Sequence, residues 1–378
     1  MKIFLFDMDG VLLEAQGYHR ALQETLRRMT LALGFEEATV SAGVIAAFEA
    51  AGVSSEWDEA AIITARLLER VWQDEPERGL PDSLADPLPL ASPPRPLPDL
   101  AALARAFSTP AMLPLHPLER AGRFFLRKPG RTALQEQTLH DLILGARLAD
   151  LSLAHRTFQE LVLGSQEYAR VYDFPPEHHC ESYLLTHDRP TLSQAAAQQL
   201  CEWIAAPGHA AAVITSRPSR APAGVFSTPE AELGARLVGL ENIPIAGWGG
   251  LCWLGLQTHI SPQSFLKPSP VHALAGMRMA LGAGQEIALK EAADLAENGL
   301  AGPDWHQLRE SEISVFEDTP GGVQSLQAAV RLLEKGGVPL RPAYYGIARE
   351  PVKLQALEAC SARVFASLAD ALEAVCKE

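Results

Sequence analysis

The stretch MKIFLFDMDGVL at residues 1–12 decides the fold. Residues 3–6 form an apolar run that stops at Asp7, and Asp9 and Gly10 follow at once. A short apolar run bounded by an acid and a glycine is typical of a buried strand of a parallel sheet that leads into a loop. The sequence therefore predicts a strand over residues 2–6 with two carboxylates just beyond its carboxyl end.

The same arrangement recurs in the second half of the chain. Apolar runs cover residues 210–214, 313–316, 343–347 and 363–366, and a closing helix is expected over 367–376. Residues 284–312 are expected to form an extra helical excursion. Short buried strands that alternate with helices predict an α/β protein with a Rossmann-like, doubly wound parallel sheet as its core.

Residues 14–190 interrupt this alternation of strands and helices. Helical patterns are predicted from about 18 to 73, over 99–107 and over 133–171. Between them, residues 76–98 contain eight prolines, which exclude a regular helix or central strand, so we expect a proline-rich surface loop there, with a working lid as the less favoured alternative. We predict a core of residues 1–13 and 191–378, and a mainly helical cap inserted at 14–190.

A local motif marks the return of the chain to this core. Thr191-Leu192-Ser193-Gln194 has the residue types of a capping box, in which a hydroxyl and an amide side chain satisfy free backbone groups. The motif predicts a helix that begins here and runs to about Ala205.

Composition limits the classes of function. The chain has 378 residues and a formal net charge of −14, which disfavours nucleic acid and anionic membranes as partners. No stretch approaches the roughly 20 apolar residues of a membrane helix, and the N-terminal run is too short for a signal peptide. The five cysteines include no C-x-x-C pair. We expect a reduced, cytoplasmic protein, and its oligomeric state stays open.

Acidic residues follow two of the predicted strands. Asp7 and Asp9 follow the first, and Glu317 and Asp318 follow the strand at 313–316. Parallel strands present their carboxyl ends at one edge of a sheet, where ligands bind, so these side chains are expected to meet. Crowded carboxylates cannot all stay ionised without a cation, and a site rich in oxygen suits Mg²⁺.

Two further residues could serve a phosphate at the same edge. Thr215 ends the strand at 210–214 and can donate its hydroxyl proton, and Lys267 can neutralise both a phosphate and a carboxylate. A carboxylate that attacks phosphorus forms an aspartyl-phosphate, and a second carboxylate can act first as general acid and then as general base.

Four segments resemble, in order, the four motifs of the haloacid dehalogenase-like (HAD) superfamily: FDMDGVL at 6–12, Thr215 after AAVI, LKPSPVHAL at 266–274 and FEDTPGGV at 316–323. The resemblance implies that Asp7 is the nucleophile and a Mg²⁺ ligand. It implies that Asp9 is the acid/base and binds Mg²⁺ through its backbone carbonyl. The remaining implied roles are metal binding by Asp318 with support from Glu317, and phosphate binding by Thr215 and Lys267. Ser216 follows Thr215 in the sequence, and its backbone amide could also reach the phosphate.

The resemblance also implies a reaction, the Mg²⁺-dependent hydrolysis of a small phosphorylated metabolite by a phosphatase, a phosphoric monoester hydrolase. Asp9 favours a phosphate ester over a halide substrate, because a departing alkoxide needs a proton. Two alternatives stay open: a phosphomutase of the same superfamily, and a non-catalytic scaffold that binds metal and phosphate.

One basic stretch departs from the acidic character of the chain. Arg123, Arg127 and Lys128 lie within six residues of one another and could receive a second anionic group of the substrate. A solvated basic face is the favoured interpretation of such a run.

Overall fold

The structure is a computed structural model that describes residues 1–376 apart from 37–39, 54, 86–93, 110–111 and 113–114. The chain divides into two compact units: Met1–Ala15 with Asp188–Glu378, and Gln16–His187. The first boundary between the units thus lies two residues after the boundary expected from the sequence, and the second boundary lies three residues before the expected one. Among the described residues, no helix has the length and apolar character needed to cross a membrane.

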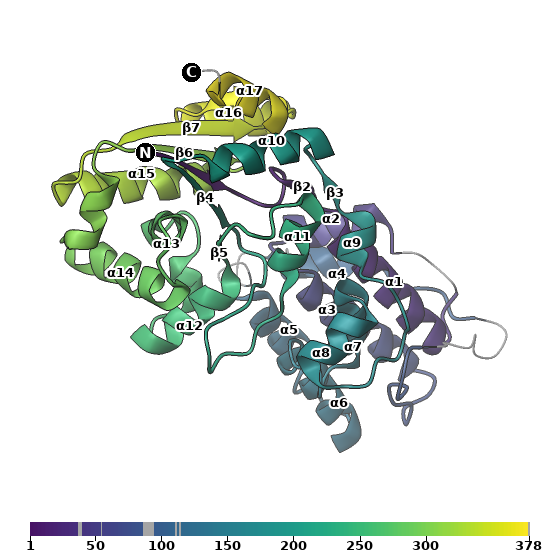
Figure 1. The fold of residues 1–378 in the computed structure, drawn as a ribbon. Coiled ribbons are helices and arrows are strands. Elements are labelled where there is room, and N and C mark those ends of the chain that lie inside the picture. Colours follow the sequence, from purple (N-terminus) through teal and green to yellow (C-terminus); the bar gives the residue numbers. More distant parts are fainter. Residues whose placement is uncertain (37–39, 54, 86–93, 110–111, 113–114, 377–378) are drawn as a thin grey trace. The chain divides into compact units, whose positions relative to one another are not determined.

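A six-stranded parallel sheet forms the centre of the first unit (Figure 1). Its strand order is β5-β4-β1-β6-β7-β8, and every neighbouring pair is parallel. The predicted α/β class with a Rossmann-like sheet is confirmed. The short β5 was not predicted, because two residues carry no periodicity. The strands are β1 (Lys2–Phe6), β4 (His209–Ile214), β5 (Ile245–Ala246), β6 (Glu312–Glu317), β7 (Arg341–Ile347) and β8 (Arg363–Phe365).

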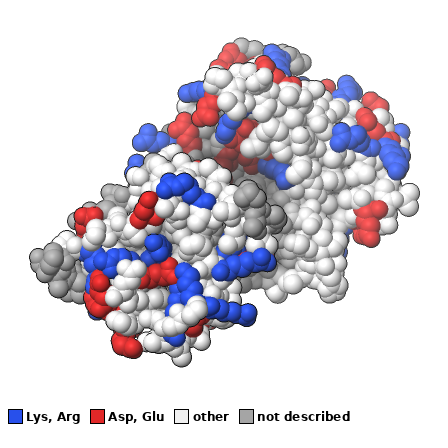
Figure 2. Space-filling view, turned by 180° about the vertical axis from the view of Figure 1, so that it is seen from behind, with Lys and Arg blue, Asp and Glu red and all other residues white. Residues whose placement is uncertain are grey.

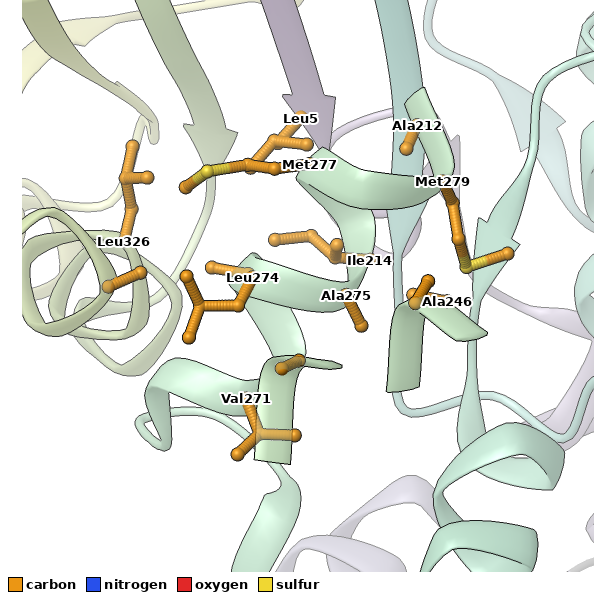
Figure 3. Close-up of a cluster of buried hydrophobic side chains, with 14 of the residues drawn as sticks. Leu5, Ala212, Ile214, Ala246, Val271, Leu274, Ala275, Met277, Met279 and Leu326 are labelled. Carbon is orange, nitrogen blue, oxygen red and sulfur yellow. The ribbon is translucent and has the colours of Figure 1, made fainter. Parts of the chain in front are cut away.

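Both faces of the sheet are covered, as a central parallel strand requires. Ile3 and Leu5 enter one hydrophobic cluster, and the intervening Phe4 and Phe6 enter another. Figure 3 shows part of the first cluster, in which Leu5 lies beside Met277 of α13 (Pro270–Ala280). The second cluster includes residues of α10 (Gln194–Ala205) and α17 (Leu368–Cys376), on the opposite face of the sheet (Figure 1).

The other helices of this unit connect the strands. The excursion expected at 284–312 consists of a helix, α14, and a short 3₁₀ turn, η2. The remaining elements are α11 (Glu230–Val238), α12 (Trp248–Thr258), η1 (Pro262–Phe265), α14 (Gln285–Asn298), η2 (Pro303–Leu308), α15 (Pro320–Lys335) and α16 (Pro351–Ala359).

A short antiparallel ribbon, β2 (Leu13–Glu14) with β3 (Arg189–Pro190), joins the outgoing and the returning chain. The capping box predicted at Thr191 is wrong. The Thr191 hydroxyl donates instead to the carbonyls of Val11, at 2.5 Å, and Leu12, at 3.2 Å. The N-cap of α10 is Ser193, whose side chain accepts from the amide of Ala196 at 3.2 Å.

The second unit is helical in its described parts, which include no strand. On α3 (Glu56–Val71), Ala61, Ala65, Leu68 and Val71 form a buried apolar face. Residues 76–85 and 94–98 of the proline-rich stretch contain no helix or strand, and 86–93 lie outside the described residues. The helices are α1 (Gly17–Ala32), α2 (Ala42–Ala50), α3 (Glu56–Val71), α4 (Leu100–Phe107), α5 (Pro117–Phe125), α6 (Ala133–Leu144), α7 (Leu153–Leu163), α8 (Ser165–Tyr172) and α9 (Tyr183–His187).

Candidate metal and phosphate site

The register of three neighbouring strands places the acidic residues together. β1 lies between β4 and β6, and Phe6 is level with Val213 on one side and Phe316 on the other. The amide of Asp7 donates to the carbonyl of Phe316 at 3.0 Å, which extends the ladder by one residue. Asp7 therefore leaves the sheet at the same edge as the ends of β4 and β6.

Three carboxylates gather at this edge. Asp7, Glu317 and Asp318 each offer an oxygen within 4.8 Å of the others. Among the described residues, these three form the group of acidic, histidine or cysteine side chains that lie close enough together to hold a metal ion. The convergence expected from the sequence is thus present for these three side chains. The Asp9 carboxylate is not part of the cluster, and metal binding through its backbone carbonyl stays a prediction.

Lys267 is held inside the cluster. Its ammonium donates to Asp7 Oδ1 at 2.6 Å and also pairs with Glu317. The Lys267 and Asp7 side chains are each 13% exposed and the Glu317 side chain is 0% exposed, so removal of Lys267 would leave two buried carboxylates without compensation. Lys267 lies three residues before α13, in the loop after η1.

Burial governs the protonation of this group. It raises the pKa of the Asp7 carboxyl well above its ordinary value; the Lys267 charge lowers that pKa, and the charges of Glu317 and Asp9 raise it further. Burial lowers the pKa of Lys267, but Asp7 and Glu317 more than offset this and raise it overall. The acids outnumber the ammonium inside the cluster, and their carboxylate oxygens are of the ligand type that could hold a divalent cation.

Two glycines make the close approach of the acids possible. Gly10 has φ +78°, and a Cβ there would lie 2.4 Å from Asp318 Oδ2. A Cβ on Gly322 would lie 1.7 Å from Glu317 Oε1. A side chain at either position would therefore displace a carboxylate of the cluster, and Gly10 also adopts a backbone conformation that other residues rarely adopt.

Asp318 has a cationic partner that the sequence did not indicate. The Lys353 ammonium, on α16, donates to Asp318 Oδ2 at 2.7 Å. This hydrogen bond raises the pKa of Lys353, whose side chain is 49% exposed. Lys353 follows Asp318 by 35 residues on a helix surface, where a single lysine gives no local signal.

Asp9 is held by Arg217, which also was not among the predicted site residues. Arg217 Nε lies 2.9 Å from both Asp9 carboxylate oxygens, and Nη2 lies 2.5 Å from Oδ1. The same Nη2 donates to Asp188 Oδ2 at 2.8 Å. In the sequence Arg217 follows Thr215 and Ser216, and that adjacency was the available signal.

Thr215 lies at the end of β4, as expected. It is buried, its amide donates to the carbonyl of Ala246 at 3.0 Å, and its hydroxyl oxygen accepts from the amide of Arg217 at 3.2 Å. The hydroxyl keeps its own proton in this arrangement, so it can donate to one further acceptor. Ser216, which is exposed, follows in the same loop.

The basic residues proposed for the substrate belong to the helical unit. Arg123 donates to Glu119 at 3.2 Å, and Lys128 donates to Glu69 at 2.7 Å. Arg127 is the residue directly before Lys128. On the face in Figure 2, lysine and arginine side chains are interspersed with acidic ones. These ion pairs favour a solvated face, and a substrate role for the three residues stays a prediction.

Comparison with known proteins gives a likeness of fold. No protein-family model matches the chain. No curated protein matches it. An X-ray structure of a Northeast Structural Genomics Consortium target is similar over 100% of this chain and 98% of that chain, with a TM-score of 0.60 and 15% sequence identity. At this identity the likeness shows the α/β fold alone.

Proposed function

We propose that this chain is a Mg²⁺-dependent phosphohydrolase of the HAD type, which cleaves a small phosphate monoester through an aspartyl-phosphate on Asp7. The observation that carries the proposal is the buried group of Asp7, Glu317 and Lys267 beside Asp318, at the carboxyl edge of adjacent parallel strands. The order of the four sequence segments supports the same class.

The donor set fits Mg²⁺. Carboxylate oxygens are its preferred protein ligands, and it usually keeps several waters and contacts few protein groups. Asp7 and Asp318 would hold the ion, with Glu317 in support and the Asp9 carbonyl as a further ligand. When bound, the ion would supply positive charge against the phosphate oxygens and the attacking carboxylate.

The first half of the reaction forms a covalent intermediate. An Asp7 oxygen attacks phosphorus, the ester P–O bond breaks, and the departing oxygen takes a proton from Asp9. The Thr215 hydroxyl and the Ser216 amide donate to phosphoryl oxygens, and Lys267 offsets their charge. Lys267 also favours the ionised, nucleophilic form of Asp7 because it donates to Asp7 Oδ1 at 2.6 Å.

The second half restores the protein. Asp9, now ionised, takes a proton from water as the water oxygen attacks phosphorus. The bond between phosphorus and the Asp7 oxygen breaks, which releases inorganic phosphate and regenerates the Asp7 carboxylate.

The test is phosphate release from p-nitrophenyl phosphate with Mg²⁺ and with a chelator. We expect turnover that the chelator abolishes and that Asp7→Asn lowers by at least about 1000-fold, because the nucleophile is lost. Asp294→Asn is the matched control, since Asp294 is an exposed aspartate of α14. Equal turnover in the two variants would refute the covalent mechanism.

A further inference from the structure

The guanidinium of Arg217 joins two carboxylates of very different exposure. The Arg217 side chain is 2% exposed, the Asp188 side chain 0% and the Asp9 side chain 38%. Arg217 therefore has a buried anionic anchor on one side and a partly exposed carboxylate on the other.

The surroundings fix Arg217 in place. Its amide donates to Thr215 Oγ1 at 3.2 Å, and its carbonyl accepts from the amide of Trp248 at 3.0 Å. The side chain passes close to Gly234, where a Cβ would lie 3.4 Å from Arg217 Nη1 and 2.7 Å from Met8 Sδ. A planar guanidinium held in this way imposes an orientation on a carboxylate, which a single flexible donor cannot do.

The contacts distinguish the two oxygens of Asp9. Oδ1 receives both Nε, at 2.9 Å, and Nη2, at 2.5 Å, whereas Oδ2 receives Nε alone, at 2.9 Å. Oδ2 therefore keeps more capacity for a further hydrogen bond, and it is the oxygen better suited to carry a proton to and from a substrate.

We propose that Arg217 is a positioning residue for Asp9 and that Asp188 anchors Arg217. The inference rests on the proposed function, in which Asp9 is the acid/base. Arg217 turns the partly exposed Asp9 side chain so that Oδ1 is occupied and Oδ2 faces the leaving oxygen. Asp188 holds the Arg217 guanidinium in a fixed position and offsets its charge inside the protein.

Asp188, the residue that anchors Arg217, lies where the chain returns from the helical unit to the core unit. Asp188 is the first residue of the core unit after the helical insertion, and it precedes β3, the strand that pairs with β2. Asp9 precedes β2 on the outgoing chain. Arg217 thus ties together the outgoing and returning segments of the core at the residue that would transfer the proton.

The test compares two esters whose leaving groups differ in basicity. The p-nitrophenolate ion leaves with little need of a proton, whereas the more basic phenolate depends on the general acid. We expect Arg217→Met to lower kcat/KM for phenyl phosphate at least about tenfold more than for p-nitrophenyl phosphate, since a general acid is worth about 100- to 10,000-fold. Arg217→Lys, which keeps the charge without the planar fork, should restore part of this loss.

A double-mutant cycle separates positioning from structure. In an Asp9→Asn background, Arg217→Met should change kcat/KM for phenyl phosphate by less than about twofold, because its effect passes through Asp9. Asp188→Asn should give the same leaving-group pattern with a smaller loss. Arg220→Met is the matched control, an exposed arginine of the same loop, and should leave both esters unaffected.

Each contrary result identifies what has failed. Equal losses for both esters in Arg217→Met and Arg217→Lys, or the same loss with and without Asp9, would show that Arg217 does not act through Asp9. Unchanged kinetics in both variants would also overturn the inference. Wild-type protein that hydrolyses neither ester would refute the proposed function itself, and the inference would fall with it.

Discussion

Gly322→Ala tests whether Glu317 organises the site. Gly322 lies in the first turn of α15, and an added Cβ would lie 1.7 Å from Glu317 Oε1 and 1.9 Å from Glu317 Cδ. Since the Glu317 side chain is 0% exposed and paired with Lys267, it has no solvent to move into. The methyl group must push the carboxylate away from Lys267 or shift the helix.

The expected change in the stability of the core unit is the sum of two opposing effects. An extra methyl group in a tightly packed interior destabilises by about 1–3 kcal/mol. Alanine in place of glycine gains up to about 1 kcal/mol of helix propensity, which offsets part of that loss. We expect the core unit to lose about 1–2 kcal/mol of stability. Under the proposed function, Mg²⁺-dependent turnover should fall far more, by at least about 100-fold, because both Lys267 and the carboxylate cluster lose their geometry.

The neighbouring glycine is the control. A Cβ on Gly321 would find its nearest neighbour, Lys267 Cβ, at 4.0 Å, an ordinary contact. Gly321→Ala should keep its activity and the wild-type urea midpoint, or a slightly higher one. The assay is urea unfolding alongside phosphate release for the two variants. If Gly322→Ala proved as stable and as active as Gly321→Ala, the role given to Glu317 would be wrong.

Two further predictions concern other charges. Burial, then nearby acids, raise the pKa of Glu59 to about 9, so the folded state keeps a proton that the unfolded state loses, and stability falls as pH rises from about 4.5 to about 9. Glu59→Gln should stabilise the helical unit at pH 7 by at most about 3 kcal/mol and by little at pH 4.5. The control is Glu77→Gln at an exposed position, which should leave stability unchanged at both pH values. A difference in urea midpoint between Glu59→Gln and the wild type that did not depend on pH would contradict this prediction. Lys353→Met should tighten Mg²⁺ binding about two- to fivefold by calorimetry, because the half-exposed ammonium competes for Asp318; unchanged or weaker binding would refute that competition.

The main features of the core could be predicted from sequence because burial leaves a direct record. The strands predicted from the apolar runs at 3–6 and 313–316 correspond to β1 and β6, and parallel pairing then places their carboxyl ends at one edge. That rule is sufficient to bring Asp7 and Glu317 together without any knowledge of side-chain positions.

Other features depend on partners far away in the chain. Thr191 has the residue type of a helix cap, yet the ribbon of β2 and β3 offers it the carbonyls of Val11 and Leu12, and this tertiary contact overrides the local motif. The contacts of Arg217 with Asp9 and of Lys353 with Asp318 span 208 and 35 residues. No spacing rule in a single sequence reports such pairs.

The most direct measurement is the chemical state of Asp7 during turnover. Asp9→Asn, which should slow hydrolysis of the intermediate, is incubated with p-nitrophenyl phosphate and Mg²⁺ and quenched in acid. Borohydride then reduces any acyl phosphate, and the peptide of residues 3–20 is sequenced by mass spectrometry. We expect Asp7 reduced to homoserine, with chelator and Asp7→Asn abolishing the signal. Steady release of phosphate by the wild type from a protein whose Asp7 is never modified would contradict the account.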